Sequence, residues 1–276
     1  MLNVKRVMLM SLLGASMLLG ACTEKEATSE ANASGQTVAI SGSTSVGPLA
    51  EKLAASFEKE ANHTIEVNQI GSSAGITNAM NGVSEIGMSS RDLKEEEAIA
   101  LQQTVIAYDG IVVVTHPSNP VKQLTMAQVK QIFTGEITNW QALGGEDLEI
   151  VVVSREDGSG SRDAFQEIVG YKSSELIPNA IVASGNGNIK TTVAMNKHAV
   201  GFISFEYIDD SIATFTIDGV EATADNVLAQ TYPLARPFLF VHQDGALSAA
   251  GTQFIEYILS EDGQQIVEQA GAIRVK

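Results

Sequence analysis

The chain has 276 residues, of which 44% are hydrophobic and 5% aromatic, and it carries 33 acidic against 17 basic side chains. The formal charge of −16 at pH 7 excludes the extended basic surface on which nucleic-acid binding depends. It does not exclude a small anion, because exposed charges are screened within about 8 Å at physiological salt and aligned N–H groups act at shorter range.

The start of the chain has the order of a secretory signal over residues 1–21. Lys5 and Arg6 precede a mostly apolar run, Val7–Leu19, that is too short to span a bilayer. The chain's only cysteine, Cys22, follows directly after a Gly-Ala pair. This ending resembles the cleavage and acylation site of bacterial lipoproteins. The resemblance implies an extracytoplasmic protein, anchored to the membrane through a lipid such as palmitate on Cys22; the alternative is a secreted protein with a free thiol.

Residues 22–36 contain no large apolar side chain, which predicts a flexible tether behind the lipid anchor. Lys5 and Arg6 are the only charged residues among the first 21, so the mature chain has 15 basic and 33 acidic side chains and a formal charge of −18. The 240 residues that remain are enough for two lobes. With no second cysteine to form a disulfide within the chain, the hydrophobic core must stabilise them.

Short apolar strands alternate with helical stretches along the rest of the chain, a pattern typical of an α/β fold. Strands are predicted at residues 38–40, 65–70, 85–88, 104–115, 150–153, 181–183, 201–204 and 237–242. Helices are predicted to begin near Pro48, Thr125 and Ser161 and to cover residues 250–259 and 263–269.

Four loops share one arrangement, in which an apolar strand ends, a short run rich in Ser, Thr, Gly or Asn follows, and a helix begins. They are Ser41–Gly47, Gly71–Gly75, Asp157–Ser161 and Ser184–Asn188. Ligands of open α/β sheets bind at the carboxyl ends of the strands, and free N–H groups at helix N-termini favour anions. The four loops together favour a site for a small oxyanion, although any one of them alone fits an ordinary helix cap.

Several segments resemble the phosphate-binding lipoproteins of bacterial phosphate ABC transporters. In chain order they are SGSTSVGPL, GSSAG, EIGMSSRDL, LTMAQVKQIFTGEITNW and SREDGSGSRDAF. The resemblance covers residues 38–276, and its most specific parts are Leu124–Trp140 and the DGSGS loop. It implies the type II fold of periplasmic binding proteins, with two lobes that each contain a mixed sheet flanked by helices, joined by a two-strand hinge. Lobe 1 would comprise residues 37–109 and 237–276, and lobe 2 residues 110–236.

The same resemblance implies a monomeric binding protein without a cofactor or enzymatic activity. It would capture inorganic phosphate outside the cytoplasm and deliver it to the permease subunits of an ABC importer. Carried over by position, the phosphate ligands are expected to be Thr44, Ser45, Ser72, Ser90, Arg155, Ser159, Gly160 and Ser161. Further candidates are Ser43, Arg91, Asp109, Asp157, Asn186 and Gly187. Arg155 would be the one cationic ligand, and Asp157 would hold its guanidinium by an ion pair.

One position departs from the family pattern. Many relatives carry an Asp where this chain has Ser90, and that Asp accepts the proton of hydrogen phosphate and repels sulfate. Ser90 can donate or accept, so the acceptor could instead be Asp109, which we favour, or Asp92. Alternatively, Asp109 only ends a turn at Asp-Gly. Sulfate, molybdate and a phosphonate therefore stay open as alternative ligands at this point.

Gly71–Gly75 also fits the Gly-x-Ser-x-Gly elbow of serine hydrolases, with Ser73 as nucleophile. His242, with Asp209 or Asp225, would complete the required order of residues. No His-Gly-Gly segment precedes this short motif, which lies early in the mature chain, so an enzyme is disfavoured.

The other classes of site have little support in the sequence. The four histidines are scattered, with no two at helical spacing, so no metal site is expected; they are His63, His116, His198 and His242. No Walker motif is present, so no nucleotide is expected either. An adhesive or sensory lipoprotein with the same fold is the third alternative.

Overall fold

The computed structural model describes residues 35–275. The expected signal peptide, the lipidation site Cys22 and most of the expected tether lie outside these residues. Gln36, the last residue of the expected tether, accepts a hydrogen bond from the Thr64 N–H (2.9 Å) and therefore belongs to the folded part. No helix in the described part of the chain is both long and apolar enough to cross a bilayer.

The strands form one hydrogen-bonded path in the order β2-β1-β3-β11-β4-β8-β6-β7, with β9 paired to β4 and a separate β5–β10 pair. The strands are β1 (Thr37–Gly42), β2 (Thr64–Gln69), β3 (Ile86–Ser89), β4 (Gln102–Thr115), β5 (Gln123–Leu124), β6 (Val151–Arg155), β7 (Ile181–Ala183), β8 (Ala199–Ser204), β9 (Ala213–Thr214), β10 (Thr216–Ile217) and β11 (Ala235–His242). The α-helices are α1 (Gly47–Glu60), α2 (Ser72–Met80), α3 (Glu95–Ala100), α4 (Met126–Phe133), α5 (Gly160–Val169), α6 (Gly185–Met195), α7 (Ala224–Leu228), α8 (Ala249–Leu259) and α9 (Glu261–Gln269).

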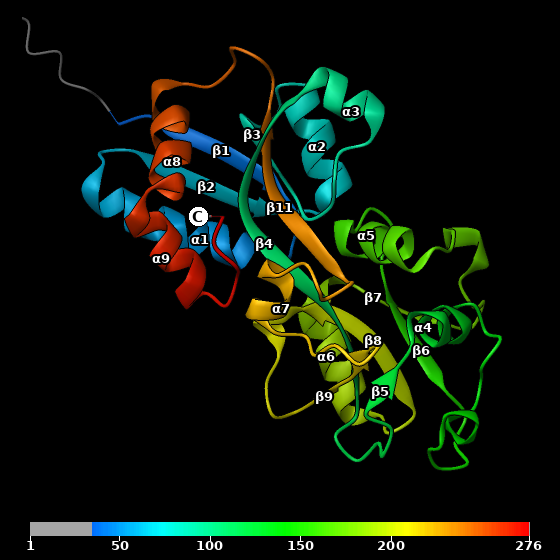
Figure 1. Ribbon diagram of the computed structural model, residues 1–276. Helices are drawn as coiled ribbons and strands as arrows, with labels where there is room; N and C mark the ends of the chain where they lie inside the picture. The colour runs from blue at the N-terminus through cyan, green and yellow to red at the C-terminus, as the bar shows by residue number, and fades with distance from the viewer. Residues whose placement is uncertain (1–34, 276) are drawn as a thin grey trace, which may run out of the picture. The chain divides into compact units, whose positions relative to one another are not determined.

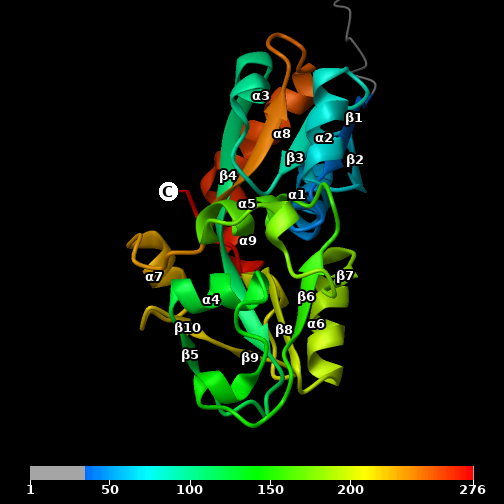
Figure 2. The same cartoon turned by 90° about the vertical axis from the view of Figure 1, so that its right-hand side faces the viewer.

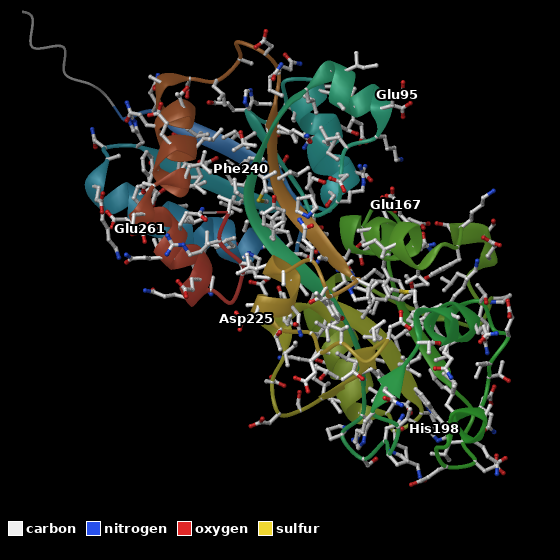
Figure 3. All side chains as sticks on the ribbon, viewed as in Figure 1. Glu95, Glu167, His198, Asp225, Phe240 and Glu261 are labelled. Atoms are coloured by element: carbon white, nitrogen blue, oxygen red, sulfur yellow. The ribbon has the colours of Figure 1, made fainter. Side chains whose placement is uncertain are left out.

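Lobe 1 is the set of elements that pack around the first hydrophobic core, and α1 shows why they do so. Leu49, Leu53 and Phe57 recur at helical spacing and are all buried on one face of α1. Phe57 packs against Phe254 of α8, with ring centroids 5.2 Å apart. Phe240 of β11, labelled in Figure 3, is fully buried in the same core. The helices α1, α8 and α9 thereby cover one face of the sheet β2-β1-β3-β11-β4 (Figure 1).

Lobe 2 is the set of elements around a second and a third core, on opposite faces of the β4-β8-β6 sheet. On one face Phe165 of α5 stacks on Phe202 of β8, with ring centroids 4.1 Å apart. On the other face Ile189 and Val193 of α6 pack against Val153 of β6. The N-terminal end of α5 therefore has a fixed position relative to the sheet of lobe 2.

Two strands cross between the lobes. β4 pairs with β11 over residues 102–110 in lobe 1 and with β8 over residues 111–115 in lobe 2. In Figure 1 β4 and β11 run side by side from one lobe into the other, and in Figure 2 α5 lies where the two lobes meet. This confirms the predicted α/β fold with two lobes and a two-strand connection.

The eight predicted strands are all present, with ends within two residues of the predicted ones. Thr125 caps α4 as predicted, accepting from the Gln128 N–H at 3.1 Å. The helix predicted to begin at Ser161 begins at Gly160 instead, because Ser159 is its N-cap. The prediction missed β5, β9 and β10, which have two residues each and therefore no hydrophobic periodicity to detect.

Candidate anion-binding site

Five buried serine hydroxyl groups from both lobes meet just beyond the ends of β1, β2, β3 and β6. Ser43 Oγ donates to Ser90 Oγ at 2.9 Å, Ser45 Oγ lies 2.8 Å from Ser161 Oγ, and Ser72 Oγ lies 3.3 Å from Ser90 Oγ. None of the five is more than 2% exposed. We call Ser43, Ser45, Ser72, Ser90 and Ser161 the hydroxyl cluster. Each hydroxyl can donate or accept, so the cluster can reorient toward an anion without carrying charge itself.

Four helices begin at the cluster, namely α1, α2, α5 and α6. The N-cap side chains of α1, α2 and α6 make no capping hydrogen bond, although the Gly185 N–H at the start of α6 donates to Glu156 Oε2 at 3.2 Å. On α5, Ser159 Oγ accepts from the Arg162 N–H at 3.3 Å. A side chain on Gly160 would collide with the Ser72 hydroxyl, so glycine is what lets α5 approach α2 this closely. Such helix N-termini favour negative charge.

Arg155, at the end of β6, is the first cation beside the cluster and is only 1% exposed. Its Nε and Nη2 each donate to the Glu156 carboxylate at 2.8 Å. Nη2 also donates to Thr44 Oγ1 of lobe 1 at 2.9 Å, and Nη1 donates to Asn186 Oδ1 at 3.3 Å. Burial opposes ionisation of Glu156, but the Arg155 guanidinium outweighs it and holds the pKa of Glu156 below its usual range.

Arg236, at the start of β11, is a second buried cation that the sequence analysis missed. Its Nη1 donates to Ser161 Oγ at 2.6 Å and to the Ser90 carbonyl at 3.1 Å. Its Nε and Nη2 donate to Asp109 Oδ2 at 2.9 and 2.7 Å. The expectation that Arg155 is the one cation at the site is therefore wrong, because Arg236 also contacts the hydroxyl cluster. The signal available in the sequence was Arg236 itself, a lone basic residue just before the apolar 237–242 strand.

Asp109 has no free oxygen with which to accept a proton from an anion. Oδ2 accepts both Arg236 bonds, while Oδ1 accepts from Ser204 Oγ at 2.8 Å and from the Phe205 N–H at 3.2 Å. Burial raises the pKa of Asp109, and Arg236 together with the Ser204 and Phe205 donors counters that rise. The favoured interpretation of Asp109 as proton acceptor is therefore wrong, because this carboxylate orients Arg236. Asp92 remains an untested candidate.

Asn186 contacts the hydroxyl cluster, but three other candidates do not. Asn186 is 1% exposed and donates from Nδ2 to Ser45 Oγ at 2.9 Å. The prediction that Asp157 pairs with Arg155 is wrong, since Asp157 is exposed and pairs with Arg162, and Glu156 takes its place. Arg91 points to Glu97 and Asp163 rather than to the cluster. Gly187 is exposed on α6, one residue beyond the buried Asn186.

The residues of the hydrolase alternative are not brought together. Asp209 pairs with Lys190, and His242 Nδ1 lies 2.9 Å from the Gln243 carbonyl. The Ser73 N–H donates to the Gly158 carbonyl at 3.2 Å, in the loop before α5 where Arg236 contacts Ser161. His242 is six residues beyond Arg236 on the same strand, or about 20 Å from it at 3.3 Å per residue. Within residues 35–275 no group of three His, Cys, Asp or Glu side chains could hold a metal ion.

Comparison with known proteins gives consistent matches. The PBP superfamily domain matches residues 27–262. The phosphate-binding protein PstS of Bacillus subtilis is 32% identical, covering 98% of this chain and 94% of its own. A structure from Clostridium perfringens, described as a phosphate ABC transporter substrate-binding protein with bound phosphate, is 58% identical with a TM-score of 0.85, covering 87% of this chain and 100% of its own. An ABC-type phosphate transport receptor from Vibrio cholerae is 36% identical with a TM-score of 0.76, covering 86% and 99%.

Proposed function

The chain belongs to the PBP superfamily and, within it, to the phosphate-binding proteins of ABC transporters, and on this premise we propose that it captures inorganic phosphate outside the cytoplasm for import. Binding would be tight and would leave the ligand chemically unchanged. The closed, phosphate-loaded form would then be the one presented to the permease subunits of the transporter.

One observation carries this proposal. Five buried hydroxyls and four helix N-termini converge beside Arg155 and Arg236, and each arginine already has its own carboxylate, Glu156 or Asp109. The donors are therefore mostly uncharged groups, namely N–H groups with fixed directions and hydroxyls that can turn, while the two guanidinium groups lie beside them. An oxyanion with four oxygens fits such an arrangement, because each oxygen can accept from more than one direction. The overall negative charge of the chain acts at longer range and is screened there.

The ligand would bind between two moving parts. We propose that residues 37–109 with 237–276 move as one lobe and residues 110–236 as the other. Contacts across this boundary support closure around the cluster, since Ser45 meets Ser161 and Arg155 meets Thr44. β4 and β11 would act as the hinge, because β4 continues from lobe 1 into lobe 2 and β11 pairs with it up to Gly110, where β4 passes into lobe 2.

The membrane attachment is proposed from the sequence alone. Acylation of Cys22 would hold the mature chain at the membrane, with residues 22–36 as the spacer. In cells, Cys22→Ala should release the protein from the membrane fraction. Continued sedimentation of the variant with membranes would rule out this anchor.

Calorimetry on the mature chain tests the ligand. Phosphate, arsenate, sulfate, molybdate and a phosphonate would be titrated at pH 6 and pH 8, and phosphate should bind at one site with the highest affinity. At a hundred times its Kd, a ligand that binds only the folded state should also stabilise the protein by about 2.7 kcal/mol. Saturable binding of another oxyanion without binding of phosphate would overturn the proposal.

A further inference from the structure

Arg91 follows Ser90 of the hydroxyl cluster but makes its contacts outside it. Its guanidinium is 3% exposed and forms two parallel bonds with Glu97, Nη1 to Oε2 at 2.7 Å and Nη2 to Oε1 at 2.9 Å. Nη1 also donates to the carbonyl of Asp92 at 2.8 Å. Both partners belong to the β3–α3 segment of lobe 1, so lobe 1 alone holds Arg91 in a fixed orientation.

A further donor of Arg91, Nε, reaches the other lobe. Nε donates to Asp163 Oδ2 at 3.2 Å, and Asp163 lies in the first turn of α5. That turn also contains Ser161 of the hydroxyl cluster. Within residues 35–275, the other ion pairs join groups of a single lobe or lie in the crossing strands. The Arg91–Asp163 pair therefore joins the lobes directly beside the site.

This pair can break without leaving a buried charge unpaired. If the lobes separate, Arg91 keeps its two bonds to Glu97. Asp163 is already 32% exposed and would pass into water. The pair thus forms only when the lobes are closed. Its free energy therefore stabilises the closed form relative to an open one.

We propose that Arg91 and Asp163 form a latch that holds the closed form and sets how long the anion stays bound. The proposal rests on the proposed function. Arg91 and Asp163 are positioning residues, because neither belongs to the hydroxyl cluster. Contacts made only after closure act on the dissociation rate and leave the association rate nearly unchanged.

The test is Asp163→Asn in the mature chain, with association and dissociation of radiolabelled phosphate measured by rapid mixing. The latch predicts dissociation about two- to tenfold faster and association within about twofold. Without a latch, electrostatics alone predicts slower dissociation, because removing a negative charge near the bound phosphate should hold the phosphate longer. Asp163→Glu, which restores the carboxylate, should recover slow dissociation at least in part. Glu167→Gln, on the exposed side of the same helix (Figure 3), is the matched control and should change neither rate.

A second variant shows whether Arg91 is the partner. Arg91→Lys keeps the charge next to Glu97 but removes the planar donor geometry, so Asp163→Asn should have less effect in that background. Equal effects in both backgrounds, or unchanged or slower dissociation in Asp163→Asn, would overturn the latch while phosphate binding stands. Failure of the unaltered protein to bind phosphate would instead overturn the proposed function, and the latch with it.

Discussion

Arg236 and Asp109 face each other in register across β11 and β4 and form an ion pair of 2.7 Å in which both side chains are 1% exposed. The same guanidinium donates to Ser161 of lobe 2 and to the carbonyl of Ser90 of lobe 1. Because β4 and β11 are the strands that cross between the lobes, the pair connects these strands to residues of both lobes at the site.

Asp109→Asn should destabilise the protein strongly even without phosphate. The amide keeps the shape of the carboxylate but leaves the Arg236 guanidinium buried without a countercharge. Removing one partner of a buried pair costs about 3–5 kcal/mol, so the free energy of unfolding in urea should fall by that amount. Asp244→Asn, at an exposed turn after β11, is the control and should stay within about 0.5 kcal/mol. A loss below about 1 kcal/mol for Asp109→Asn would mean that the pair does not stabilise the hinge.

Arg155→Gln should weaken phosphate binding by about 2–5 kcal/mol, which is a factor of roughly 30 or more. The variant removes a buried cation that faces Thr44, Asn186 and Glu156, and it leaves the Glu156 carboxylate to repel the ligand. Calorimetry measures the change. Arg274→Gln removes a positive charge that pairs with Glu261 rather than with a group of the hydroxyl cluster, and it controls for the overall charge. Binding within a few-fold of the unaltered protein would exclude Arg155 from the site.

Local patterns in the sequence were enough for the strands, the helix starts and the polar loops between them. Ser43 and Ser72 follow β1 and β2, which are parallel neighbours, so these two could be expected together before any contact was seen. Ser161 follows β6 of the other lobe, which runs opposite to β1 along the sheet path, so its place beside them depends on how the two lobes face each other. The resemblance to a family then narrowed the ligand to phosphate. Within this region the errors concern the partners of individual charged side chains rather than the loops themselves.

Those partners depend on geometry that a single sequence does not contain. Glu156 and Asp157 are adjacent, and which of them meets Arg155 depends on where β6 ends and how the chain turns into α5. Asp109 and Arg236 are 127 residues apart, and their contact follows from the register of an antiparallel pair. Register is set by packing on both faces of the sheet, which no local pattern in one chain reveals.

Glu206→Gln should change how stability depends on pH. Glu206 lies in the turn after β8, and its Oε1 is buried without a hydrogen-bond partner among the described residues. Burial, together with the nearby Asp109 carboxylate, raises the pKa of Glu206 to about 8, although Lys52 and Arg236 oppose the rise. From about pH 4.5 to 8 the folded state therefore keeps a proton that the unfolded state has lost. Stability should fall as pH rises through this window, by up to about 1.4 kcal/mol per pH unit.

The measurement is urea unfolding at pH 6 and pH 8 for both proteins. The glutamine cannot ionise, so the stability of Glu206→Gln relative to the unaltered protein should increase from pH 6 to pH 8. Glu167→Gln, at an exposed site on α5, should show no such increase. A constant difference at the two pH values would mean that Glu206 ionises normally in the folded state.

Two glycines in the helices that begin at the site should respond in opposite ways to alanine. A methyl group on Gly75 of α2 would collide with the backbone of Ser41 and Gly42 in β1, so α2 must move away from the sheet. Because α2 begins with Ser72, Gly75→Ala should both lower the unfolding free energy, by about 1–3 kcal/mol, and weaken phosphate binding.

Gly187 of α6 has helical backbone angles and no atom near the position of an added methyl group. Gly187→Ala should therefore stabilise the protein by about 0.5–1 kcal/mol, since alanine loses less conformational freedom in a helix. Urea unfolding of both variants checks these signs, and a stabilising Gly75→Ala would show that the contact between α2 and β1 is not close-packed.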